Sequence, residues 1–296
     1  RETMRSLKKK IVLVTSLILF VSMALITTIL TKTSIMNTRQ TVKEIFEETT
    51  TVAADVVESR LIVIENLVDE LSRDKALTAE GSTQVDKQKV LDTIVGRNGF
   101  IAATLTDKNG KGLDGNNYAA MEAFQKAMAG EVYVDSPRPT ADGKTARMIV
   151  TAPLWKDGVQ GGEIVGCVIG TLDGTYLSNI TNGIEIGESG RAYIINKEGT
   201  TIANVNYNQI LIGQNNIKLA VNGEAAFGGI EFENVKKMIY LTPIADTDGW
   251  SLGIYIDNKD FLQSSYNNAI ISVCISLVLI LIGVLIMSRF GKSIAM

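Results

Sequence analysis

Two long apolar stretches limit what this chain can fold into. No charged residue occurs between Ile11 and Thr31 or between Ala269 and Met287. As a helix rising about 1.5 Å per residue, each stretch covers a hydrocarbon core of ~30 Å. The first stretch lacks the small-residue cleavage site of a secretory signal peptide, so we read it as an uncleaved anchor. We therefore predict transmembrane helices over residues 11–32 and 266–288.

Basic residues next to these stretches predict the orientation of the chain. Arg1, Arg5, Lys8, Lys9 and Lys10 precede the first stretch, and Arg289 and Lys292 follow the second. Because cytoplasmic flanks are enriched in Lys and Arg, we expect a two-pass membrane protein with both termini cytoplasmic and residues 33–268 outside. The net charge is -3 although both tails are positive, so the external region is acidic. Nucleic acid is therefore not an expected partner.

Histidine is absent from the whole chain. Its absence excludes Ser-His-Asp and Cys-His catalysis and every zinc site that uses imidazole. The segment from Asp107 to Tyr118, DKNGKGLDGNNY, is similar in composition to a calcium-binding loop. Because Lys111 occupies one of the ligand positions, we interpret the segment as an Asn-Gly turn. The glycines of GGEIVGCVIG lack the Lys of a phosphate loop and are expected to serve packing. We predict no enzymatic activity, no cofactor and no metal.

A long helix is predicted to follow the first span, over residues 33–74. One apolar stripe with coiled-coil spacing comprises Val42, Ile45, Thr49, Val52, Val56 and Val63. A second stripe comprises Val57, Leu61, Ile64, Val68 and Leu71. Two stripes indicate a stalk helix that packs on its own domain and on a partner chain, which predicts a homodimer. The alternative is a helix that covers one domain of a monomer.

The region beyond Asp74 contains the same strand pattern twice. FIAATLTDKNGKGLD and ARMIVTAPLW make up the first copy, and RAYIINKEGTTIAN and KKMIYLTPIAD make up the second. Each copy ends with a further strand, EIVGCVIGTLD or WSLGIYID. The short segment YAAMEAFQKAMAG in the first copy is predicted to be a helix that ends at Gly130. We infer an α+β fold of two tandem modules, each an antiparallel sheet with helical cover.

Three features of the first copy suggest a ligand site, and each has a purely structural alternative. Asp173 ends an apolar strand on the same face as Thr171, where it would receive a ligand ammonium or cap the next helix. Arg138 lies between two prolines and suits a bidentate grip on a carboxylate, unless it is a solvated loop residue. Tyr118, Met121 and Phe124 step by three and would form the core or roof a pocket.

The layout resembles the sensor half of a bacterial transmembrane chemoreceptor with a double Cache domain, that is, two PAS-like modules on a long helix between two spans. The resemblance is densest in YAAMEAFQKAMAGEVYVDSP, TAPLWKDGVQGGEIVGCVIGTLDGTYLSNI, GESGRAYIINKEGTTIANVN and TPIADTDGWSLGIYIDNKDF. It implies a membrane-distal ligand-binding module over residues 75–185 and a membrane-proximal module over 186–265. Residues 1–10 would be a cytoplasmic tail, and RFGKSIAM, residues 289–296, resembles the start of a HAMP linker.

In amino-acid-binding members of that family, the pocket carries an Arg-x-Trp-aromatic run, a loop Tyr and a terminal Asp. Asp173 and Phe124 match this pattern, whereas Met121, Ala123 and Arg138 stand in place of the Arg, the Trp and the loop Tyr. The implied ligand is an amino acid, an amine or an organic acid. The candidate ligand-binding residues are Tyr118, Met121, Phe124, Arg138, Arg147, Thr171 and Asp173. The segment between Asn216 and Met238 is short and is expected to lack a helix.

The resemblance implies small-molecule sensing and transmembrane signalling by a methyl-accepting chemotaxis receptor. A cytoplasmic part beyond Met296 would then engage a kinase and an adaptor. One alternative is the same sensor coupled to a membrane diguanylate cyclase or histidine kinase. A second alternative is a structural or adhesive surface protein.

Overall fold

The computed structural model describes residues 2–140, 145–203, 215–232 and 234–293. The described part confirms the mixed helix and sheet architecture with two antiparallel sheets. Its elements divide between two compact units, which we describe separately. The sheet unit comprises Phe46–Ile230 and Met238–Tyr255, and the helical unit comprises Arg1–Ile45, Glu231–Lys237 and Ile256–Met296.

Two long helices dominate the helical unit. The helix α1 (Glu2–Ser72) begins in this unit and continues into the sheet unit, and α6 (Asn258–Ser293) follows the last strand. Both are long and apolar enough to cross a membrane. Within the helical unit their hydroxyl side chains meet, with Thr38 Oγ1 lying 3.0 Å and Ser34 Oγ lying 3.5 Å from Ser265 Oγ. Of the predicted linker 289–296, residues 294–296 lie outside the described residues.

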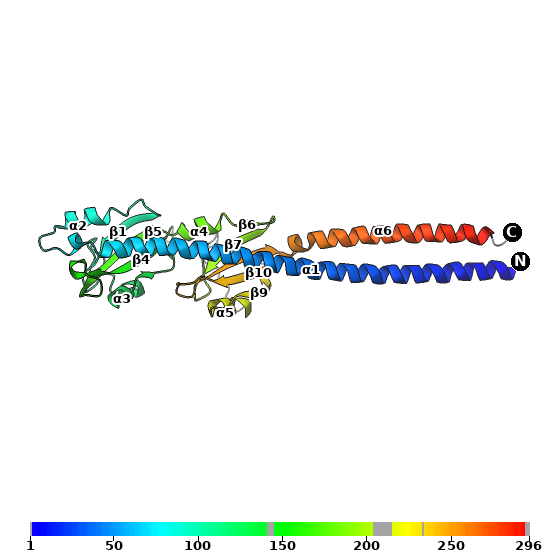
Figure 1. The fold of residues 1–296 in the computed structure, drawn as a ribbon, viewed down its shortest axis with the longest axis horizontal. Coiled ribbons are helices and arrows are strands. Elements are labelled where there is room, and N and C mark those ends of the chain that lie inside the picture. The colour runs from blue at the N-terminus through cyan, green and yellow to red at the C-terminus, as the bar shows by residue number, and fades with distance from the viewer. Residues whose placement is uncertain (1, 141–144, 204–214, 233, 294–296) are drawn as a thin grey trace. The chain divides into compact units, whose positions relative to one another are not determined.

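The first sheet, with its helices, forms what we call the first module (Figure 1). Its strand order is β1-β5-β4-β2, with β3 also paired to β4. The strands are β1 (Phe100–Leu105), β2 (Tyr133–Val134), β3 (Arg138–Pro139), β4 (Ala146–Trp155) and β5 (Ile164–Asp173). The helices are η1 (Lys75–Leu77), α2 (Gln84–Leu91), α3 (Glu122–Met128) and η2 (Lys156–Gly158).

The second sheet repeats this arrangement in what we call the second module, which follows the short helix α4 (Tyr176–Thr181). Its strand order is β6-β7-β11-β10-β9, with β8 paired to β7. The strands are β6 (Glu185–Ile186), β7 (Gly190–Ile195), β8 (Thr201–Ala203), β9 (Ala226–Phe232), β10 (Val235–Pro243) and β11 (Ser251–Asp257). In both sheets the last strand lies between the first long strand and the strand that carries Met-Ile and Pro. The predicted repeat is confirmed.

A helix does cover the second sheet, contrary to the expectation for this segment. The helix α5 (Asn215–Val221) places Ile217 and Ala220 in one buried cluster with Tyr193, Ile239 and Leu241. Ser251 Oγ donates a hydrogen bond to the Ala220 carbonyl at 2.9 Å. The expectation was wrong because one apolar turn is enough to bury this sheet face, and short helices leave a weak sequence pattern.

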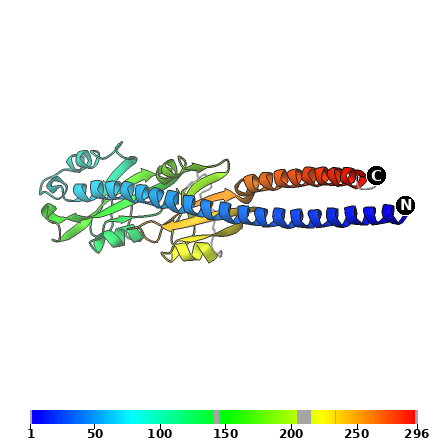
Figure 2. The same cartoon turned by 45° about the vertical axis from the view of Figure 1, so that its right-hand side comes forward.

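The second stripe of α1 backs the sheet unit (Figure 2). Val57, Ile64 and Val68 are fully buried, and Thr50 Oγ1 accepts a hydrogen bond at 3.0 Å from Thr242 Oγ1 of β10. The first stripe behaves differently. Its members Ile45, Val52, Val56 and Val63 remain exposed. The two predicted faces of the helix are therefore both present, and only one of them is covered within this chain.

Alternation along β5 places it between two layers. Cys167 and Ile169 pack with Phe124 and Ala127 of α3. Gly170 faces the other way, where an added Cβ would meet Phe100 and, at 3.0 Å, Val68 of α1. At Gly166 an added Cβ would collide with the Thr106 carbonyl oxygen. These glycines serve close packing, as the sequence predicts.

The carboxyl group of Glu65 is half-buried on α1, in the sheet unit. Burial and, second, the charge of Asp246 raise the pKa of Glu65 to about 7. An unfolded chain ionises this group near its ordinary value of 4.5. The folded state therefore binds the proton more tightly, so its contribution to stability is complete below pH 4.5 and is lost as the pH rises to about 7.

We predict that Glu65→Gln raises the melting temperature of the full chain at pH 8, because it removes a half-buried charge beside Asp246. The gain should shrink steadily at pH 6 and become small at pH 4.5, where the native carboxyl is neutral as well. Thermal melts in detergent at the three pH values measure this difference. Glu70→Gln, at an exposed position on the same helix, is the control. An equal gain at every pH would contradict the role of ionisation.

Candidate functional site

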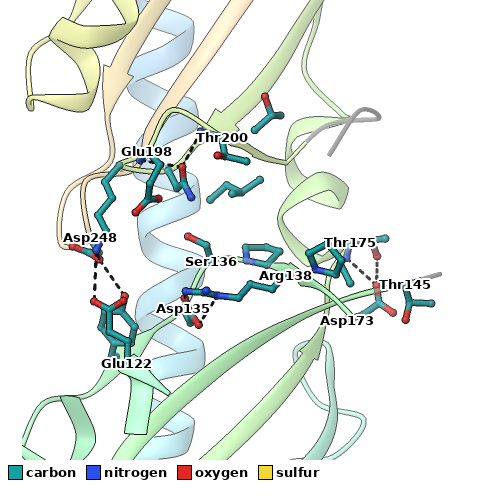
Figure 3. Close-up of a pocket in the computed structure, with 18 residues that line it drawn as sticks. Glu122, Asp135, Ser136, Arg138, Thr145, Asp173, Thr175, Glu198, Thr200 and Asp248 are labelled. Carbon is teal, nitrogen blue, oxygen red and sulfur yellow. Dashed lines mark hydrogen bonds and ion pairs between the residues drawn. The ribbon is translucent and has the colours of Figure 1, made fainter. Parts of the chain in front are cut away.

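A cavity of about 640 Å³ lies within the sheet unit and is lined by both modules. We call it the intermodule cavity (Figure 3). The first module contributes the loop between β2 and β4 and the end of β5, and the second contributes the turn between β7 and β8 and one residue before β11. The residues with polar side chains in its lining are Glu122, Tyr133, Asp135, Ser136, Arg138, Thr145, Asp173, Thr175, Asn196, Lys197, Glu198, Thr200, Thr201 and Asp248.

An arginine and a buried carboxylate form one wall of the cavity. Arg138 donates from Nε and Nη2 to the two carboxylate oxygens of Asp135 at 3.0 and 2.9 Å. The Asp135 side chain is only 7% exposed, whereas that of Arg138 is 65% exposed. This bidentate bond raises the pKa of Arg138 above its ordinary value. The pair arises because Pro137 and the strand β3 return the chain toward β4, where Arg138 is opposite Arg147.

Asp173 lies at another end of the cavity, where β5 stops. Its Oδ1 accepts hydrogen bonds from the Thr175 amide at 2.9 Å and the Thr175 hydroxyl at 2.6 Å. These bonds lower the pKa of Asp173, and the charge of Arg147 adds to the effect. The Arg147 guanidinium is 3.8 Å from Oδ2, a long ion pair across the β4–β5 register. Asp173 therefore shapes the turn before α4, whose N-cap is Thr175, and also lines the cavity.

We call four of the residues that line the cavity the clasp: Glu122, Tyr133, Lys197 and Asp248. Figure 3 shows Glu122 and Asp248 on the side of the cavity away from Asp173. Lys197 Nζ lies 2.5 Å from Asp248 Oδ2 and 3.6 Å from Glu122 Oε1. The Tyr133 hydroxyl donates to the same Asp248 oxygen at 3.1 Å. The hydrogen bond with Lys197 lowers the pKa of Asp248 and raises that of Lys197. Burial and, second, the Asp248 charge raise the pKa of Tyr133.

The sequence-predicted residues fall into two groups. Arg138 and Asp173 line the cavity, and Arg147 contacts Asp173. The others do not line it: Phe124 is buried in the core beneath α3, with Tyr118 and Met121 packed against the same cluster, and Thr171 lies on β5.

The predicted three-residue stepping of Tyr118, Met121 and Phe124 along one helix is not observed. The helix α3 begins only at Glu122, after Met121. Before it, the Tyr118 amide donates to the Gly110 carbonyl at 2.8 Å and the Tyr118 hydroxyl donates to Asp114 at 2.5 Å. These bonds to the Asp107–Asp114 segment hold Tyr118 out of the helix.

Several residues that line the cavity were not predicted from the sequence as site residues. Asp135 was detectable in principle, because it stands three residues before Arg138 with opposite charge. The second-module residues Lys197 and Asp248 carried no such signal. They lie in two turns that are far apart in the chain and meet the first module only in three dimensions.

The chemistry of the cavity favours binding over catalysis. Among the described lining residues there are five carboxylates and two cations, and both cations are already paired with carboxylates. Within the described part of the chain, no group of three or more acidic or Cys side chains is placed to hold a metal ion. A small number of placed polar groups is also what orients a solute in ligand pockets.

Comparisons with known proteins agree with the observed fold. Residues 34–265 match the family model described as the Cache domain. The ligand-binding domain of the Pseudomonas fluorescens chemoreceptor CtaA in complex with L-serine has 17% identity and a TM-score of 0.59, covering 75% of this chain and 99% of that one.

Two further solved structures are similar. The ligand-binding domain of the Pseudomonas aeruginosa PAO1 amino acid chemoreceptor PctC with GABA has 16% identity and a TM-score of 0.56, covering 71% of this chain and 97% of that one. The extracellular domain of the putative histidine kinase mmHK1S-Z3 has 9% identity and a TM-score of 0.60, covering 75% and 97%. No curated protein matches the chain in sequence at a significant level.

The family match covers most of the chain and includes both sheets and the second half of α1. The chain therefore belongs to the double Cache family, and its fold is similar to that of chemoreceptor ligand-binding domains.

Proposed function

We propose that this chain is the sensor part of a two-pass methyl-accepting chemotaxis receptor, with both termini in the cytoplasm and residues 33–268 outside. Two helices of sufficient length and apolarity support the two spans, and the basic flanks support the orientation. Membership of the double Cache family supports the sensor role. The output would be a cytoplasmic kinase with its adaptor.

A histidine kinase output is the second candidate. It is favoured by the similarity of the fold to the extracellular domain of mmHK1S-Z3. Both outputs require the same property of the sensor: the solute must bind two conformations of the sensor with different affinity. In both cases the sensor part itself performs no chemistry.

The single observation that carries the proposal is the polar intermodule cavity with Asp173 at its edge. A solute with an ammonium group fits the charges best, because carboxylates outnumber cations in the described lining. Asp173 is the best placed to receive it: its partner Arg147 stands 3.8 Å away, at a longer separation than the 2.9 Å of the Arg138–Asp135 pair. We therefore propose an amine or an amino acid, and we rank an organic diacid lower.

We also propose that two copies pack along the exposed stripe of α1. Val52 is 59% exposed and Val56 is 44% exposed. Together with Ile180 and Ile184 of the α4 region they line a shallow groove of about 410 Å³. A second copy anchored in the same membrane would present its own first stripe at the same distance from the membrane. A parallel pair of stalk helices would therefore bury the first stripe of each copy against that of the other.

The proposed ligand class predicts which solutes stabilise the protein. L-Serine, GABA or a short alkyl diamine should raise the melting temperature of the full chain in detergent, because a ligand at one hundred times its Kd adds about 2.7 kcal/mol. Dicarboxylates should have no such effect. Asp173→Asn should abolish the shift, and Glu80→Gln, an exposed site away from the cavity, should preserve it. If only dicarboxylates raised the melting temperature, the ammonium assignment would be overturned. If no solute in a broad panel raised it, a structural or adhesive role would be favoured.

The proposed dimer predicts the mass of the particle. Val52→Asp and Val56→Asp together should convert a dimer to a monomer in light-scattering chromatography in detergent, because four carboxylates would meet at the helix pair. Thr51→Asp introduces the same charge at a neighbouring exposed position outside the stripe and should leave the dimer intact. An unchanged mass for the double variant, with an unchanged melt, would rule out this interface.

A further inference from the structure

The clasp joins the two modules through side chains alone. Glu122 and Tyr133 belong to the first module, and Lys197 and Asp248 belong to the second. Asp248 accepts a hydrogen bond from Tyr133 at 3.1 Å, and Lys197 lies 3.6 Å from Glu122. Two polar contacts therefore link the modules, Tyr133 with Asp248 and Glu122 with Lys197. Lys197 and Asp248 are also paired with each other.

The chain crosses between the modules at a different side of the cavity. It leaves β5 at Asp173 and enters α4 at Tyr176. Figure 3 shows Asp173 and Thr175 on one side of the cavity and Glu122 and Asp248 on the opposite side. Apart from the shared helix α1, the modules are thus tied by the chain itself on one side and by polar side chains on the other. Opening at the clasp breaks only side-chain contacts, whereas the backbone holds the side of Asp173.

The clasp is also mechanically connected to the region where a solute would bind. Glu122 is the first residue of α3, and the next turn of that helix carries Phe124 and Ala127 into the core against β5. The strand β5 ends at Asp173. Tyr133 begins β2, two residues before Asp135, and Asp135 holds Arg138. A displacement of α3, β2 or Arg138 therefore moves a first-module member of the clasp.

The strength of the clasp suits a reversible device. The side chains of Lys197, Glu122 and Asp248 are 41%, 44% and 37% exposed. Ion pairs with this exposure change an equilibrium about two- to fivefold and weaken with salt. The coupling between sites in allosteric proteins is typically about 5- to 150-fold. A bound solute therefore has enough free energy to open or close such a contact, which a fully buried ion pair would resist.

We propose that the clasp is an electrostatic latch that holds the intermodule cavity closed and sets the position of the second module relative to the first. The latch converts a local movement of α3 or β2 into a movement of the turns that carry Lys197 and Asp248. Asp248 precedes β11, the strand that leads into α6. The proposal concerns the mechanics of the sensor and is independent of which solute binds.

The test measures the distance between the modules in the full chain in lipid nanodiscs, without any added ligand. Spin labels are attached at Lys108→Cys in the first module and Glu224→Cys in the second, both exposed positions, in a Cys274→Ser background. Lys197→Met should shift part of the distance distribution to an open population that is about two to five times larger than in the parent. Raising NaCl from ~0.1 to ~1 M should do the same to the parent and have no further effect on Lys197→Met.

The matched control is Lys156→Met. It removes an exposed lysine from an ion pair with Glu163 at 2.9 Å that lies entirely within the first module, and its distribution should equal that of the parent. Tyr133→Phe deletes only one hydrogen bond across the modules and should open the cavity to a smaller extent, so it serves if Lys197→Met does not fold. Identical distributions in the parent, Lys197→Met and Tyr133→Phe at both salt concentrations would overturn the latch. Because no ligand is present, this outcome says nothing against solute binding.

Discussion

Burial of one stripe of α1 is the interaction on which the sheet unit depends. Val57, Ile64 and Val68 are fully buried, and an added Cβ at Gly170 of β5 would clash with Phe100 and crowd Val68. Thr50 of the same helix reaches Thr242 in the second module. Both sheets therefore share one backing helix, and each sheet covers its other face with a short helix, α3 or α5. This shared support allows two small modules, neither of which has a large core, to remain packed together.

The shared helix also explains where the site lies. With one face of each sheet covered by α1 and the other by a short helix, the polar turns at the facing ends of the modules are left to meet each other. Arg138 and Asp135 line the cavity from the first module, and Lys197 lines it from the second. The region beneath α3 is closed instead by Phe124, Cys167 and Ile169. In the binding mode that we propose, a polar solute would find its hydrogen-bonding partners between the modules, where its arrival would also act on their relative position.

Local sequence rules predicted much of the fold. The three- and four-residue spacing of apolar side chains along residues 33–74 predicted both stripes of α1, and the repeated Met-Ile and Pro positions predicted two sheets with one topology. The rules failed at short segments. The helix α5 was missed because a seven-residue helix has little periodicity, and the start of α3 was misplaced because bonds from Tyr118 to Gly110 and Asp114 compete with the helix.

The sequence by itself determined the class of protein and the two ends of the first-module site, Arg138 and Asp173, because strand endings and proline-flanked loops are local features. Only the tertiary structure decided what those residues face. Asp135 neutralises Arg138 because the chain reverses at Pro137, and the clasp exists because the turn that carries Asp248, 115 residues further along the chain, lies against Tyr133. Contacts between distant segments depend on how α1 positions the two sheets, and no local pattern in the chain encodes that distance.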